Sequence, residues 1–166
     1  MYFVFSLPRV WSYIEKEGRD VEDNRKTWSY FQEQWTKYVE TRHLTSGESV
    51  TFPETYGIKE RDAFYKSLAF AKWGGSSGHD APMIAYDALL FARDDWVTLC
   101  EHGMLHSGDN DSTGVISGFC FGAMYGFSGV PACNYEDVEY KGRLVDSGKK
   151  LFEMAKSDGY LEKFVQ

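Results

Sequence analysis

HSGDNDSTGVISGFCFGAMYGFSGVP, residues 106–131, joins a cluster of acids to the longest uncharged stretch of the chain. Asp109 and Asp111 lie two residues apart, and the hydroxyls of Ser112 and Thr113 follow directly. Like charges this close repel each other, and each raises the pKa of the other. We therefore expect a positively charged group to lie between the two carboxylates.

The uncharged stretch after Asp111 is long enough to span a bilayer. Glycine recurs along it at every fourth residue, at Gly114, Gly118, Gly122 and Gly126. This spacing leaves one helix face nearly bare, which also occurs in membrane helix dimers. We favour a buried, central helix over 114–126 whose glycine face touches another helix, and we expect that second helix to run from Pro82 to about Leu105.

The composition describes a single acidic globular domain over residues 1–166. The chain is 43% hydrophobic, 17% aromatic and carries a net charge of -7, which argues against nucleic acid as a partner. Its three cysteines have neither CxxC nor zinc-ligand spacing, and this favours a reducing compartment, so we expect a cytoplasmic protein.

The remaining patterns predict helices and no convincing strands. An apolar stripe at helical spacing is expected to face the core, at Trp28, Phe31, Trp35 and Tyr38. A second helix is predicted over 59–70, between loops at 44–57 and 73–82, and Pro82 suits the first turn of the helix that follows. The predicted fold class is all-α, with glycine-rich loops at 73–81 and 107–114 each leading into a helix.

The acidic cluster has features of three kinds of site. DNDSTG resembles the start of an EF-hand loop, but the twelfth position is Cys120 where a bidentate Glu is needed. Ser112 and His106 could serve a serine hydrolase, but no GxSxG elbow surrounds Ser112. A hard-cation site remains, because two carboxylates and a hydroxyl at the start of a helix suit Mg²⁺ or Mn²⁺. Such a site needs further ligands from elsewhere, from water or from substrate.

Residues 106–131, with WGGSSGHDAPMIAYDALL before them and NYEDVEYKGRL after them, resemble the carboxy-terminal half of the ADP-ribosylglycohydrolase family, most closely its branch that hydrolyses ADP-ribosylarginine. The resemblance implies an all-α, orthogonal helical fold around two Mg²⁺ ions, and hydrolysis of the N-glycosidic bond between ADP-ribose and a protein arginine. It implies that Asp109 and Asp111 are catalytic and bind metal, and that Ser112 lends its hydroxyl to the first ion. His106 is expected to orient the acidic loop rather than to bind metal.

The glycine-rich loop before the second motif is the predicted site of contact with ADP-ribose. The residues concerned are Gly74, Gly75, Ser76, Ser77 and Gly78. Bare backbone and hydroxyls suit phosphate or ribose, although the same glycines could serve only the turn into the next helix.

Two residues depart from the family pattern, and one motif is missing. Ser107 replaces a glycine, which is expected to alter the turn slightly, and Asn110 replaces a small residue with little expected effect. The family's amino-terminal half supplies a Ser/Thr-Asp-Asp-Thr motif that this sequence lacks, and Asp94-Asp95 is no substitute, because it is expected inside a helix with its acids facing solvent.

The sequence therefore resembles a fragment, a truncated gene model or a short isoform, and a complementing amino-terminal half is a candidate partner. The alternative function is an inactive fragment or pseudoenzyme that binds ADP-ribose or a partner protein.

Overall fold

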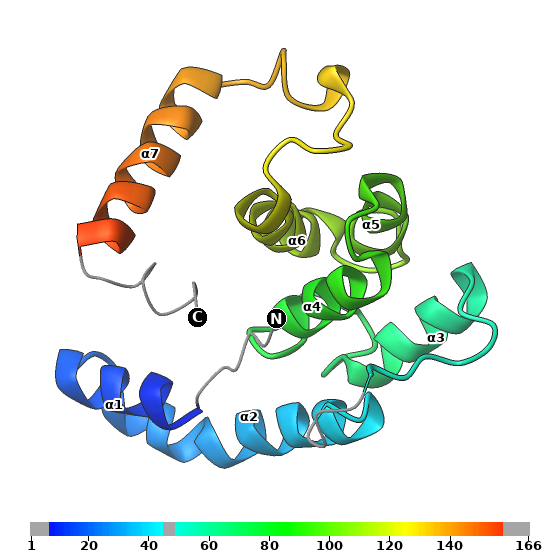
Figure 1. Ribbon diagram of the computed structural model, residues 1–166. Coiled ribbons are helices and arrows are strands. Elements are labelled where there is room, and N and C mark those ends of the chain that lie inside the picture. The colour runs from blue at the N-terminus through cyan, green and yellow to red at the C-terminus, as the bar shows by residue number, and fades with distance from the viewer. Residues whose placement is uncertain (1–6, 45–48, 158–166) are drawn as a thin grey trace. The chain divides into compact units, whose positions relative to one another are not determined.

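The computed structural model describes residues 7–44 and 49–157, and within them every regular element is helical (Figure 1). The helices in chain order are α1 (Leu7–Glu17), α2 (Val21–Thr41), α3 (Ile58–Leu68), α4 (Asp80–Ala92), α5 (Trp96–Gly103), α6 (Asn110–Tyr125), the 3₁₀ helix η1 (Ala132–Asn134) and α7 (Lys141–Ser157). The all-α prediction is confirmed. The chain divides into two compact units, residues 1–126 and 127–166. The single-domain expectation stays a prediction.

The central element of the first unit is α4, which packs against α5 and α6. Its buried residues occupy nearly every position, at Asp80, Ala81, Met83, Ile84, Ala85, Asp87, Ala88, Leu89 and Ala92. A helix that is buried on most sides is enclosed by its neighbours, and in Figure 1 α4 lies below α5 and α6 and above α2. We expected residues 114–126 to be this central helix, and that expectation was wrong.

The aromatic stripe of α2 faces the core, as predicted. Trp35 and Tyr38 are buried and form a cluster with Met83 of α4, with Phe31 packed beside them. Trp28 is half-buried and stacks on Phe31 at 5.6 Å between ring centroids. This stripe therefore fixes α2 against the face of α4 that α6 does not cover.

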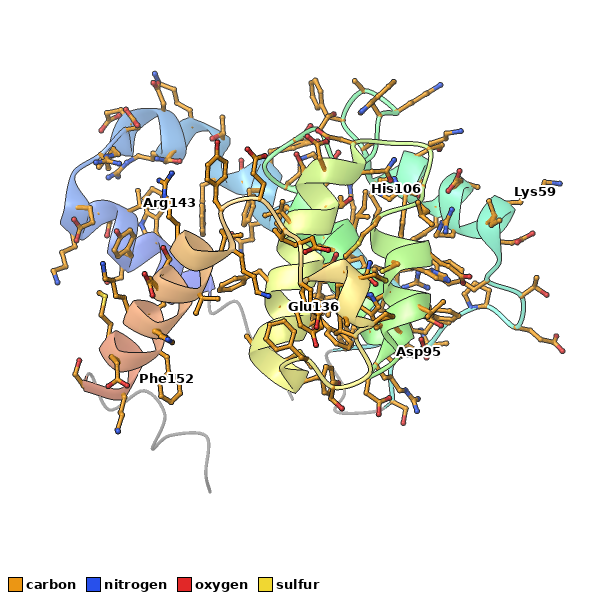
Figure 2. The ribbon with its side chains drawn as sticks, turned by 90° about the horizontal axis from the view of Figure 1, so that it is seen from above. Lys59, Asp95, His106, Glu136, Arg143 and Phe152 are labelled. Carbon is orange, nitrogen blue, oxygen red and sulfur yellow. The ribbon has the colours of Figure 1, made fainter. Side chains whose placement is uncertain are left out.

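The expected helix from Pro82 to Leu105 is two helices. Arg93 has a φ of 55°, a left-handed conformation that ends α4. Asp95 then starts α5 by accepting a hydrogen bond from the Thr98 amide at 3.0 Å, a standard helix cap. Asp94 and Asp95 face solvent as expected, but they lie at a break and not inside a helix. Figure 2 shows Asp95 and His106 at opposite ends of α5.

Helix α6 uses a different face from the one predicted. Its buried residues are Thr113, Ser117 and Phe121, and the closest approach is to α5, where a Cβ on Gly103 would lie 2.8 Å from Ser117 Oγ. A Cβ on Gly114 or Gly118 would meet only the side chain of Met104, which lies in the segment predicted to touch the glycine face, whereas a Cβ on Gly122 or Gly126 would meet open space. The glycine face is thus partly covered near its start and exposed near its end. Among the described residues, no helix combines the length and apolarity that crossing a membrane requires.

The second unit contains η1 and α7. Phe127 and Tyr135 stack at 4.3 Å between ring centroids, and Arg143 lies over the ring of Tyr140. Arg143 and Phe152 both lie on α7 in Figure 2, and within the described chain no residue of α7 is buried. All three cysteines of the chain are free thiols.

Candidate functional site

The structure brings Asp109, Asp111 and Ser112 together at the amino end of α6. Asp109 is the residue that caps this helix, and its Oδ1 accepts a hydrogen bond from the Ser112 amide at 3.3 Å. Asp111 lies in the first turn and shares a hydrogen bond with the Asp109 carboxyl, and the Ser112 hydroxyl donates to Asp109 as well. Three oxygen-bearing side chains therefore meet at one helix end, which begins at Asn110 rather than near Thr113.

The pKa of Asp109 is lowered although a second carboxyl lies beside it. The hydrogen bond that its side chain shares with Asp111 lowers this pKa most, and the Ser112 amide lowers it further. We expected the neighbouring like charge to raise the pKa, and at Asp109 the hydrogen bonds outweigh that repulsion. The positive end of the helix dipole also favours negative charge here. In the described part of the chain, neither acid forms an ion pair with a basic side chain.

The glycine-rich loop and the acidic loop are in direct backbone contact. The Asp109 amide donates to the Gly74 carbonyl at 2.8 Å. A Cβ on Gly75 would lie 2.8 Å from the Asp109 carbonyl oxygen, and a Cβ on Gly108 would lie 2.0 Å from that of Gly74. Gly75 also has a φ of 92°, which disfavours side chains. These glycines allow two segments over thirty residues apart in the sequence to touch.

One residue of the glycine-rich loop reaches the open groove beside the acids. The groove has a volume of about 630 Å³ and is lined by Gly78, Ala81, Pro82, Asp111, Ser112, Val115 and Ile116. Gly74 and Gly75 are buried against the acidic loop instead. Ser76 donates its hydroxyl to the Trp73 carbonyl, and the Ser77 amide donates to Asp80. Contact between residues 74–78 and ADP-ribose stays a prediction.

His106 lies inside the acidic loop, as its expected orienting role requires. Its ring is 6% exposed and lies edge-on to Tyr65. The Gly108 amide donates to Nδ1 at 3.0 Å, and Nε2 lies 2.8 Å from Thr113 Oγ1. Burial lowers the pKa of His106, and the nearby charge of Arg61 lowers it further. Both ring nitrogens are therefore occupied by the protein.

Asn110 matters more than the sequence indicated. Its side-chain oxygen accepts a hydrogen bond from the His106 amide at 2.8 Å, and its side-chain nitrogen donates to the His106 carbonyl at 2.8 Å. This reciprocal pair closes the turn that carries Asp109, so the expectation of a small effect was wrong.

A second anchor of the acidic loop escaped the sequence analysis. Arg61 of α3 is 2% exposed and donates to the Glu101 carbonyl and, at 3.0 Å, to that of Leu105. Its neighbour Asp62 accepts hydrogen bonds from the side chain and the amide of Ser107. Ser107 thus provides an attachment that glycine could not fully supply. No spacing rule links residues forty positions apart, so nothing in the sequence pointed to this contact.

The acid pair and Ser112 are the oxygen donors that this part of the fold provides. In residues 7–44 and 49–157, no group of three or more His, Cys, Asp or Glu side chains is arranged to hold a metal ion. His79, which the sequence left unassigned, is buried and hydrogen-bonded to the Leu68 carbonyl at 3.1 Å.

The family model described as ADP-ribosylglycohydrolase matches residues 6–160. The chain belongs to the ADP-ribosylglycohydrolase family. It is 41% identical over 162 residues to the ADP-ribosylhydrolase ARH1 of Dictyostelium discoideum, covering 87% of this chain and 41% of that protein. It is 25% identical over 130 residues to a protein of Acanthamoeba polyphaga mimivirus named as an ADP-ribosyl glycohydrolase, covering 69% of this chain and 23% of that protein. This chain therefore spans less than half the length of these relatives.

Proposed function

We propose that this chain provides one part of a magnesium-dependent site that hydrolyses the N-glycosidic bond between ADP-ribose and a protein arginine. The observation that carries the proposal is the meeting of Asp109, Asp111 and Ser112 at the start of α6, beside a groove that Asp111 and Ser112 line. Family membership and the 41% identity to the ADP-ribosylhydrolase ARH1 support hydrolysis of an ADP-ribose linkage. Arginine as the linked residue is part of the proposal and rests on the sequence resemblance.

The donor set fits a hard divalent cation. Two carboxylates and a hydroxyl are oxygen ligands of the kind that Mg²⁺ prefers, with Mn²⁺ as an alternative. Among the described residues, no basic side chain forms an ion pair with Asp109 or Asp111, and two neighbouring carboxylates favour a counter-charge. Asp109, Asp111 and Ser112 would hold the ion, which would supply Lewis-acid activation at the ribose. Mg²⁺ needs about six ligands, so other donors must complete the shell.

The chain's own residues would bind and orient the substrate. Gly78 and Pro82 line the groove together with Val115 and Ile116, and these apolar groups suit contact with the adenine and ribose faces of ADP-ribose. Asp111 lies where the groove meets the helix end. A carboxylate there would stabilise the positive charge that develops on a ribosyl group when a glycosidic bond breaks.

A second candidate function follows from the small number of ligands. The chain covers 41% of ARH1, and the described residues hold no third acid near the pair. We propose that donors from outside the described residues complete the site. Without them, the chain would bind ADP-ribose or a partner protein and release nothing.

The test is an assay of ADP-ribose release from ADP-ribosyl-arginine in the presence of Mg²⁺. The chain alone is compared with the chain fused to the part of the Dictyostelium relative that it does not match. We expect turnover only from the fusion, and loss of that turnover in Asp111→Asn. Asp94→Asn is the matched control, because Asp94 is exposed and lies at the start of α5, away from the groove.

An inactive fusion that still folds, or turnover that Asp111→Asn leaves intact, would contradict the proposed site. Turnover by the isolated chain, lost in Asp111→Asn, would show that these three ligands are enough and would exclude the second candidate function.

A further inference from the structure

The hydrogen bonds of the His106 ring determine which of its two nitrogens carries the proton. The Gly108 amide can only donate, so Nδ1 of His106 must be free of a proton. A neutral ring then carries its proton on Nε2, which donates to Thr113 Oγ1 at 2.8 Å. The Thr113 hydroxyl in turn donates to the Gly103 carbonyl at 2.8 Å and lies 3.0 Å from that of Asp109. One tautomer of His106 therefore fits this chain of hydrogen bonds.

This chain of hydrogen bonds encloses Asp109. The amide of Gly108, the preceding residue, is held by His106, and the amide of Asp109 itself is held by Gly74. The Asp109 carbonyl faces the Thr113 hydroxyl that His106 also contacts. Hydrogen bonds thus fix the backbone on both sides of the Asp109 side chain. The bond to the Gly108 amide involves the His106 ring directly, the bond to the Asp109 carbonyl involves it through Thr113, and the bond to Gly74 does not involve it.

We propose that His106 is a positioning residue, whose Nε2–H tautomer holds the Gly108–Asp109 backbone so that the Asp109 carboxylate points at Asp111. The role rests on the proposed function, because it presumes that the acid pair is the working site. His106 is not a ligand or a general base, since both ring nitrogens are occupied and the ring is buried beside Tyr65. Figure 2 marks His106 at the end of α5 that leads into the acidic loop.

Two substitutions separate the two ends of the ring. Asparagine places an amide oxygen close to where Nδ1 lies, so His106→Asn retains an acceptor for the Gly108 amide. Glutamine reaches toward Thr113 but leaves the Gly108 amide without that acceptor. His102→Asn is the control, because His102 is equally buried at 6% exposure and stacks on Phe91 instead of the acidic loop.

The experiment is nuclear magnetic resonance on the full chain. In the wild type, nitrogen shifts of the His106 ring should report a proton on Nε2. Hydrogen exchange of the Gly108 amide, taken relative to the Ala88 amide of α4, should rise about tenfold in His106→Gln, as loss of one buried hydrogen bond predicts. It should change little in His106→Asn and in His102→Asn. The pKa of the Asp109 carboxyl should rise toward its ordinary value in His106→Gln alone.

A proton on Nδ1 in the wild type would overturn the proposal, and so would identical Gly108 exchange and Asp109 pKa in the Asn and Gln variants, as expected for a ring that only fills space. Titration with Mg²⁺, followed at the Asp109 and Asp111 carboxyl carbons, separates this inference from the proposed function. If the wild type ignores Mg²⁺ while the exchange and pKa results hold, the proposed function fails and the positioning role stands.

Discussion

Two sets of carboxylates in this chain have opposite environments. Asp87 of α4 is fully buried and is surrounded by donors: Arg42 at 2.7 Å and 3.2 Å, the Tyr56 hydroxyl at 2.6 Å and the Tyr38 hydroxyl at 3.0 Å. Asp109 and Asp111 lie at the surface, and in the described residues they meet only each other, Ser112 and backbone.

The difference separates a structural acid from the pair that we propose to be functional. The Asp87 network joins α2, α4 and the segment around Tyr56, and it leaves no lone pair of the carboxylate open to a ligand. The surface pair is held by an equally well-ordered loop, yet its charge is left for something else to neutralise. Removing the charge of Asp87 should therefore lower the free energy of unfolding, whereas removing that of Asp111 should weaken ligand binding.

The largest effect is expected from breaking the buried pair. Arg42→Met keeps much of the side-chain volume but leaves the buried Asp87 charge without its cation, so we expect a loss of about 3–5 kcal/mol in the free energy of unfolding. Urea unfolding at pH 7 measures it. A loss no greater than that of an ordinary surface substitution would mean that Asp87 is protonated in the folded protein.

The next effect concerns the contact between the two loops. In Gly108→Ala, the new methyl group would lie 2.0 Å from the Gly74 carbonyl oxygen, so one loop must move. We expect the free energy of unfolding to fall by about 3 kcal/mol, which is the upper end of the usual cost of overpacking. We also expect a lower affinity for Mg²⁺. Gly78→Ala is the control, because a Cβ there meets nothing within 4 Å. Equal thermal stability of the two variants would refute the tight contact between the loops.

A third effect is the dependence of stability on pH through His102. Burial lowers its pKa to about 4. The unfolded chain therefore binds a proton at His102 near pH 6.5, whereas the folded protein binds it only near pH 4. The free energy of unfolding is thus highest above pH 6.5 and decreases as the pH falls toward 4. At about 1.4 kcal/mol for each pKa unit, the loss reaches about 3 kcal/mol. His102→Phe keeps an aromatic ring beside Phe91 and should flatten the urea-midpoint profile between pH 4 and 6.5. An unchanged slope would assign the titration to another group.

The smallest stability effect completes the comparison. Asp111→Asn removes an exposed negative charge next to another one, so the free energy of unfolding should stay within about 0.5 kcal/mol of the wild type. The same variant should lose the stabilisation that added Mg²⁺ gives the wild type, measured by thermal shift. A large loss of stability without Mg²⁺ would show that Asp111 has a structural role like that of Asp87.

The sequence was most informative where the structure is local. The α2 stripe and the meeting of Asp109 with Asp111 depend on helix periodicity and on spacing within one turn, so both could be predicted. The break at Arg93 could not, because neither glycine nor proline marks it and an arginine adopts the left-handed conformation.

The contacts that hold the site were also hidden from the sequence. Arg42 meets Asp87 across 45 residues, and Arg61 meets the Leu105 carbonyl across 44. Such pairs depend on how helices pack, and no periodicity encodes them. The glycine spacing of α6 was misleading for a similar reason, because Ser117 rather than the glycine face makes the closest helix contact.

The backbone bond between Asp109 and Gly74 has a consequence for how this family can diverge. Because the two loops touch without intervening side chains, an insertion or a bulkier residue in one of them would displace the other. Gly74, Gly75 and Gly108 should therefore change together or not at all among related sequences, and their loops should keep matched lengths. Variation in substrate preference would then arise along the rest of the groove, at positions such as Gly78 and Val115, where a new side chain meets no backbone.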